Sequence, residues 1–82
     1  MKLPRDISGD ELASLLRPYG YRLTRQTGSH LRLASTARGR PHHLTIPAHR
    51  ALKVGTLSSI LADVASYLEV ERGQLLDELF GR

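Results

Sequence analysis

The chain of 82 residues contains no cysteine and no tryptophan, and aromatic residues make up only 5% of it. The absence of cysteine excludes a disulfide framework and a thiolate metal site. No apolar run approaches the roughly 20 residues that span a bilayer. The first residues, MKLPRD, also lack the apolar centre of a secretory signal. We therefore expect a cytoplasmic protein that has no membrane partner.

A chain of this length buries only about 60 to 65% of its unfolded surface when it folds. That leaves room for one core, so we expect residues 1–82 to form a single domain. Leucine dominates the apolar residues. Packed aliphatic side chains must therefore supply most of the stability.

Acidic residues are scarce in the first two thirds of the chain. Residues 1–53 contain ten Lys or Arg and three Asp or Glu, a net charge of +7. Residues 54–82 contain two and five, a net charge of −3. All four histidines also lie in the first segment. This distribution is typical of a surface that binds nucleic acid, although a solubilising surface without a partner carries the same charge.

A capping box and an apolar stripe predict a first helix over residues 9–17. The Ser8 hydroxyl can accept a hydrogen bond from the Glu11 amide while the Glu11 side chain reaches back. Pro18 and Gly20 end this helix. The residues of the stripe, spaced i, i+3, i+4 and i+7, are Leu12, Leu15, Leu16 and Tyr19.

Three strands are predicted over residues 21–26, 30–35 and 42–46, with a tight turn at 27–29 in which Gly28 can take positive φ. Pro47 closes the third strand. Alternation along a strand sends successive side chains to opposite faces. The leucine-rich face should pack on the helices, and the opposite, open face should carry His30, Arg32, His43 and Thr45.

Two more helices follow, over residues 57–67 with Thr56 as a candidate cap and over residues 72–80, where Gly73 weakens the pattern. The fold class is therefore α+β. The order is α-β-β-β-α, with a three-stranded antiparallel sheet packed on two helices and a short C-terminal helix. This order is similar to that of the double-stranded-RNA-binding fold.

Three stretches resemble the HicA toxins, small bacterial mRNA interferases. They are KLPRDISGDEL at residues 2–12, GYRLTRQTGSHLRL at 20–33 and IPAHRALKVGTLSSIL at 46–61. Each stretch alone is weak, but together, in this order, they are specific. The resemblance implies the toxin of a type II toxin–antitoxin system, an endoribonuclease with its catalytic histidine at His30. It also implies a HicB-type antitoxin as partner, with a monomeric free toxin and a larger complex.

His30 suits RNA cleavage on chemical grounds as well. An imidazole, with an ordinary pKa of about 6.5, can act as base or acid at neutral pH, and nearby arginines can stabilise a charged phosphorane. The second proton-transfer group stays open between Ser29, His43, another histidine and water. The residues predicted to contact RNA are Lys2, Arg5, Arg25, Ser29, Arg32, His43, His49, Arg50 and Lys53.

The histidines do not predict a metal site, and no cofactor is expected. His42 and His43 are adjacent, so their side chains diverge in a strand. His42 has the parity of Leu44 and is expected to be a partly buried structural residue. Two rival functions remain: a non-catalytic double-stranded-RNA-binding module, and a general nucleic-acid-binding or partner-docking protein without enzymatic activity.

Overall fold

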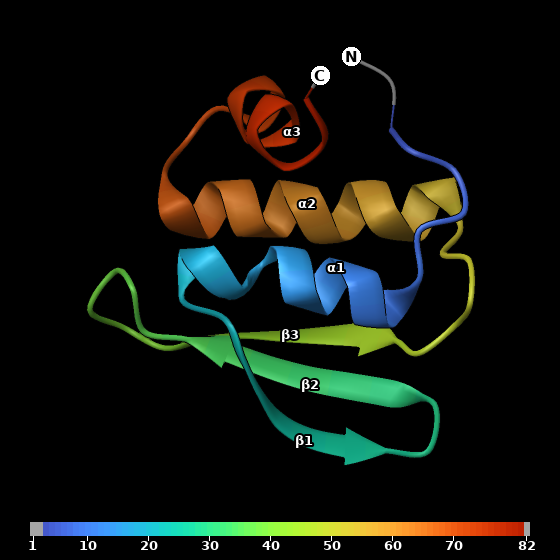
Figure 1. The fold of residues 1–82 in the computed structure, drawn as a ribbon. Coiled ribbons are helices and arrows are strands. Elements are labelled where there is room, and N and C mark those ends of the chain that lie inside the picture. The colour runs from blue at the N-terminus through green and yellow to red at the C-terminus, as the bar shows by residue number, and fades with distance from the viewer. Residues whose placement is uncertain (1–2, 82) are drawn as a thin grey trace.

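Three antiparallel strands form one sheet, and helices cover one of its faces (Figure 1). The computed structural model describes residues 3–81. The strands lie in the order β1-β2-β3. Helices α1 and α2 lie over the sheet, and α3 packs on the side of α2 that faces away from it. The elements are α1 (Gly9–Leu15), a 3-10 helix (Arg17–Tyr19), β1 (Arg22–Thr27), β2 (His30–Ser35), β3 (His42–Pro47), α2 (Val54–Leu68) and α3 (Arg72–Phe80).

This arrangement confirms the predicted fold class and order of elements. The predicted bounds of β2 and of α3 are confirmed to the residue, and β1 begins one residue later than expected. The first helix is shorter than predicted. It ends at Leu15, and Pro18 lies in the 3-10 turn that follows, which ends at Gly20 with a φ of 91°.

The start predicted for α2 was wrong. The helix begins at Val54 rather than Leu57, and its N-cap is Lys53, with no capping hydrogen bond from a side chain. The Leu57 amide already donates to the Lys53 carbonyl at 2.9 Å. Val54 has the spacing of the apolar stripe, but it is exposed and Gly55 follows it, and glycine is a poor helix former, so the first turn was not included in the predicted helix.

The core lies between the inner face of the sheet and the two covering helices. The predicted alternation is confirmed, because the inward residues of β2 and β3 are at most 4% exposed. They pack against fully buried side chains of α1 and α2 that include Leu12, Leu57, Leu61 and Val64. The inward strand residues are Leu31, Leu33, Leu44 and Ile46.

No helix within residues 3–81 is long and apolar enough to cross a membrane.

Candidate functional site

The open face of the sheet carries His30 and Arg32, as the alternation predicted. In the strand register, His30 lies opposite Thr27 of β1 and Pro47 of β3. Arg32 lies opposite Arg25 of β1 and Thr45 of β3. Directly opposite residues point to the same side of a sheet, and all of these side chains except Pro47 are exposed. Residues from all three strands therefore surround His30 on a face that no helix covers.

A β-bulge decides that Arg25 belongs to this face. Leu23 pairs with Leu33, yet Arg25 pairs with the next residue, Arg32, so Thr24 is the extra residue in β1. The Thr24 hydroxyl donates to the Arg32 carbonyl oxygen at 3.1 Å, which anchors the bulge. Without the bulge, Arg25 would share the inward face of Leu23.

The Arg25–Arg32 pair has no neutralising carboxylate. Among residues 3–81, neither guanidinium lies within 4.0 Å of an Asp or Glu oxygen. Like charges placed directly opposite each other destabilise a sheet. A bound anion would relieve this repulsion, and a phosphate matches the planar guanidinium fork. The pair is therefore a candidate phosphate site next to His30.

His30 is the first residue of β2 and follows a turn in which Gly28 has a φ of 52°. The Ser29 carbonyl oxygen accepts a hydrogen bond from the Ala48 amide at 2.7 Å, which ties the turn to the segment after β3. The His30 side chain makes no hydrogen bond to any other described residue. Both of its ring nitrogens are thus free to meet a ligand.

His43 lies on the same face but not beside His30. It pairs with Ala34, four residues further along β2 than His30. At about 3.3 Å per residue, this places the two histidines roughly 13 Å apart along the strands. One phosphodiester linkage cannot contact both side chains. His43 can only meet a neighbouring phosphate.

The segment between β3 and α2 carries three more of the predicted RNA contacts, His49, Arg50 and Lys53, and all three are exposed. The N-terminal segment holds it in place. The Gly9 amide donates to the His49 carbonyl oxygen at 3.0 Å, and the Leu52 amide donates to the carbonyl oxygen of Ile7 at 2.7 Å. Since Ala48 is bonded to Ser29, these three residues follow directly from the end of the sheet at which His30 lies.

Of the two other predicted contacts, the structure describes only Arg5. Arg5 is exposed and lines a hollow with Leu15 and Phe80. Phe80 belongs to α3, on the far side of α2 from the sheet (Figure 1). The structure thus does not bring Arg5 to the open face. Lys2 lies outside the described residues.

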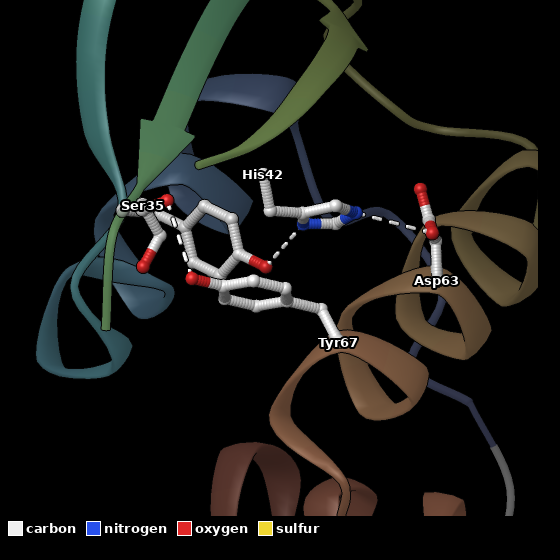
Figure 2. Close-up of polar contacts among 5 residues, drawn as sticks. Ser35, His42, Asp63 and Tyr67 are labelled. Atoms are coloured by element: carbon white, nitrogen blue, oxygen red, sulfur yellow. Dashed lines mark hydrogen bonds and ion pairs between the residues drawn. The ribbon is translucent and has the colours of Figure 1, made fainter. Parts of the chain in front are cut away.

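His42 faces the helices, as its parity predicted, and its side chain is 17% exposed. Its Nδ1 lies 2.7 Å from the Tyr21 hydroxyl, and its Nε2 lies 3.2 Å from Asp63 Oδ1 (Figure 2). The ring stacks on Tyr67 with centroids 4.6 Å apart. The Tyr67 hydroxyl in turn donates to carbonyl oxygens of Ser35 and Arg40. His42 therefore joins β1, β3 and α2.

The protonation of Tyr21 orients this network. Burial, and then the nearby Tyr67 and Asp63, raise the pKa of the Tyr21 hydroxyl well above its ordinary value. The hydroxyl therefore keeps its proton at neutral pH and can donate it to His42 Nδ1. A neutral His42 then carries its proton on Nε2 and donates to Asp63.

The Asp and Glu side chains of residues 54–82 are all exposed. Some nevertheless have structural partners. Glu69 pairs with Arg38 at 2.8 Å, and Glu78 accepts a hydrogen bond from the Tyr19 hydroxyl at 2.7 Å. Within residues 3–81, no three His, Asp or Glu side chains gather closely enough to hold a metal ion.

The family comparison covers the elements that build this site. A family model described as the HicA toxin of bacterial toxin–antitoxin systems matches residues 9–65, which is 57 of the 82 residues. The chain belongs to the HicA toxin family. The match runs from the start of α1 into α2 and includes His30, Arg25 and Arg32, while α3 lies outside it. The chain is therefore the toxin of a bacterial toxin–antitoxin system.

Comparisons with curated proteins and with solved structures gave no match.

The bulge at Thr24 and the close packing at Gly9 are site features that the sequence did not reveal. A Cβ at Gly9 would overlap the Pro47 carbonyl oxygen, so α1 can touch the end of β3 only because this residue lacks a side chain. The sequence sign of this close packing was the position of Gly9 directly after the helix cap, but other small or polar residues also occur at that position. The bulge has no comparable signal, because Thr and Arg are ordinary strand residues.

Proposed function

We propose that this HicA toxin is an endoribonuclease that cleaves mRNA through His30 and is neutralised by a HicB-type antitoxin. The observation that carries the proposal is the position of His30, exposed on the open face beside the unneutralised Arg25–Arg32 pair. A proton-transfer group and a phosphate-binding pair are what cleavage of an RNA backbone requires side by side.

The proposed reaction is a transesterification. His30 takes the proton of a ribose 2′-OH, and the 2′ oxygen attacks the adjacent phosphorus. Arg25 and Arg32 stabilise the negative charge of the phosphorane. The bond from phosphorus to the 5′ oxygen then breaks and that oxygen takes up a proton, leaving a 2′,3′-cyclic phosphate and a 5′-OH. The step needs acid–base chemistry and no metal ion.

Binding of RNA rests mainly on its phosphates. The contacts we propose are Arg25, Ser29, Arg32, His43, His49, Arg50 and Lys53. Contacts of this kind fix the position of a strand without reading its sequence. Strands β1–β3 contribute no aromatic side chain to the open face, and stacking on aromatic rings is a principal means of recognising unpaired bases. We therefore expect weak sequence preference.

The antitoxin is proposed to cover the same face. Residues 1–53 carry a net charge of +7, and an acidic surface would complement the exposed arginines around His30. In a purified complex with a HicB-type antitoxin, His30 and Arg32 should lose solvent exposure. A neutralised complex in which His30 stays accessible to RNA would count against this mode of neutralisation.

The decisive experiment incubates wild-type protein and His30→Ala with a long RNA, with and without EDTA. Wild type should cleave in both conditions, and His30→Ala should bind RNA without cleaving it. The His30 side chain is exposed and lacks hydrogen bonds to other described residues, so its removal should not unfold the protein. Undiminished cleavage by His30→Ala would overturn the assignment.

A second candidate, a non-catalytic double-stranded-RNA-binding module, is favoured only by the α-β-β-β-α order. It predicts that duplex RNA binds and stays intact. Induced expression separates the two functions. A toxic nuclease should arrest growth unless a HicB-type antitoxin is expressed with it, and His30→Ala should then not arrest growth. A non-catalytic module should give the same growth with and without His30.

A further inference from the structure

The pairing of β2 with β3 continues beyond the ends of the strands. His30 is the partner of Pro47 in the register. One step further, the Ala48 amide donates to the Ser29 carbonyl oxygen at 2.7 Å. Gly28 and Ser29 form the turn that leads back to β1, where Thr27 pairs with His30, so the pairing ends at this hydrogen bond. His49 follows Ala48 directly and is exposed, and its backbone therefore lies next to the turn from which His30 begins β2.

His30 and His49 are therefore near neighbours. Pro47, the partner of His30, is two residues before His49, and positions related in this way across an antiparallel pair lie about 7–8 Å apart, within reach of aromatic and long side chains. A Cβ built on Gly28, in the adjoining turn, would meet no atom within 4 Å, so the surface beside the turn is open. A phosphodiester group bound there is within reach of both exposed histidines.

We propose that His49 is the second proton-transfer group, acting as the acid while His30 acts as the base. The inference rests on the proposed nuclease function and identifies the group that such a reaction requires. His30 removes the 2′-OH proton as the bond between the 2′ oxygen and phosphorus forms. Protonated His49 gives its proton to the 5′ oxygen as the bond from phosphorus to that oxygen breaks. No water or other reactant is consumed in this step.

The other candidates within residues 3–81 are badly placed. His43 lies four residues along the strands from the His30 pair, and His42 is turned toward Tyr21 and Asp63. The Ser29 hydroxyl is a poor acid at neutral pH, as aliphatic hydroxyls are. The Glu11 carboxylate accepts a hydrogen bond from the Ser8 amide in the capping box.

The backbone around His49 is fixed, as a proton donor requires. Its carbonyl oxygen accepts the Gly9 amide at 3.0 Å, and Gly9 packs directly against Pro47 and Ala48. The segment is therefore clamped between the start of α1 and the turn before β2. Charged or titratable groups on the segments that contact it are Arg5, Asp6, Asp10, Glu11, His30, Arg32, Arg50 and Lys53.

The test compares two RNA substrates that differ only in the leaving atom. One is an ordinary short RNA, and the other has sulfur in place of the 5′ bridging oxygen at the cleaved linkage. A thiolate leaves without protonation, so a missing acid should matter only for the oxygen substrate. His49→Ala and His49→Gln should lose about 10²- to 10⁴-fold in rate on ordinary RNA, and should cleave the sulfur substrate at nearly the wild-type rate.

The dependence of kcat/KM on pH gives a second readout. The wild-type profile should be bell-shaped, and His49→Ala should lose the alkaline limb, which reports the acid. His43→Ala is the matched control, because it removes another exposed histidine of the same face. As the loss of an RNA contact, it should lower the rate on both substrates by the same factor and keep both limbs.

The outcomes separate the inference from the function on which it rests. If wild type cleaves neither substrate, the proposed function fails. If wild type cleaves, His30→Ala does not, and His49→Ala cleaves ordinary RNA normally, the inference alone is overturned. Equal losses by His49→Ala on both substrates would also overturn it, because they would show a phosphate-binding role. Thermal unfolding of each variant shows that a loss of rate is not a loss of fold.

Discussion

The His42 Nε2 atom lies 3.2 Å from Asp63 Oδ1 and thereby joins β3 to α2. The Asp63 side chain is 57% exposed, whereas that of His42 is 17% exposed. Of the two contacts of the His42 ring, the one that stabilises the fold more is therefore that of Nδ1 with the hydroxyl of fully buried Tyr21.

His42→Ala should destabilise the fold more than Asp63→Asn. The alanine leaves the buried Tyr21 hydroxyl without its partner, which costs about 1–3 kcal/mol, and also removes the stacking on Tyr67. Asp63→Asn removes only a solvent-screened charge, so about 0–1 kcal/mol is expected. Urea unfolding at pH 7 measures both, with Glu69→Gln in the exposed Arg38–Glu69 pair as control. Equal effects of His42→Ala and Asp63→Asn would contradict this assignment.

Stability should fall above pH 10, and Tyr21→Phe should weaken that fall. Burial raises the pKa of Tyr21 above its ordinary value of 10.0. In the unfolded chain the phenol releases its proton near pH 10, whereas in the folded chain it keeps it. The unfolded state then binds fewer protons, so the free energy of unfolding decreases as pH rises from about 10 toward the folded pKa.

Tyr19 provides a comparison for this effect. Burial and then the hydrogen bond to Glu78 raise its pKa to about 12, so its contribution is lost between about pH 10 and pH 12. Chemical unfolding at several pH values should show a shallower decline for each phenylalanine variant than for wild type. A decline that is unchanged in Tyr21→Phe would show that its hydroxyl ionises equally in both states.

Gly9→Ala should damage both stability and cleavage. Its Cβ would overlap the Pro47 carbonyl oxygen, so α1 must move away from the segment that carries His49. Overpacking of this kind costs about 1–3 kcal/mol. Gly55→Ala is the matched control, because a Cβ there meets nothing within 4 Å and alanine in a helix stabilises by about 0.5–1 kcal/mol. Thermal unfolding and RNA cleavage of both variants check this.

Arg25→Ala and Arg32→Ala should weaken RNA binding and make it less salt-dependent. Each lost phosphate contact should reduce the slope of log K against log[salt] by about 0.7 for single strands. Either change also removes a repulsive cross-strand pair, so the fold should be no less stable. Arg38→Ala, which removes a guanidinium paired with Glu69, should leave the slope unchanged. An unchanged slope in both Arg25→Ala and Arg32→Ala would exclude the open face as the phosphate site.

Alternation and capping in the sequence were enough to predict most of the fold. Ser8 and Glu11 form the predicted capping box, with hydrogen bonds of 3.0 and 2.8 Å. Leu31 and Leu33 are buried while His30 and Arg32 are exposed. These features depend on residues near each other in the chain, which is why local periodicity predicts them. The prediction of where α2 starts failed because the first turn of this helix is largely exposed and lacks a side-chain cap.

The sequence by itself determined the order of elements and the outward position of His30, because a strand has a period of two residues and apolar side chains must be buried. Only the tertiary structure decided which residues surround His30. The bulge at Thr24 turned Arg25 to the open face, and the strand register separated His43 from His30. The Ser29–Ala48 hydrogen bond brings the segment that carries His49 next to the turn before His30. Each of these depends on how one segment pairs with another, which the periodicity within a single segment does not specify.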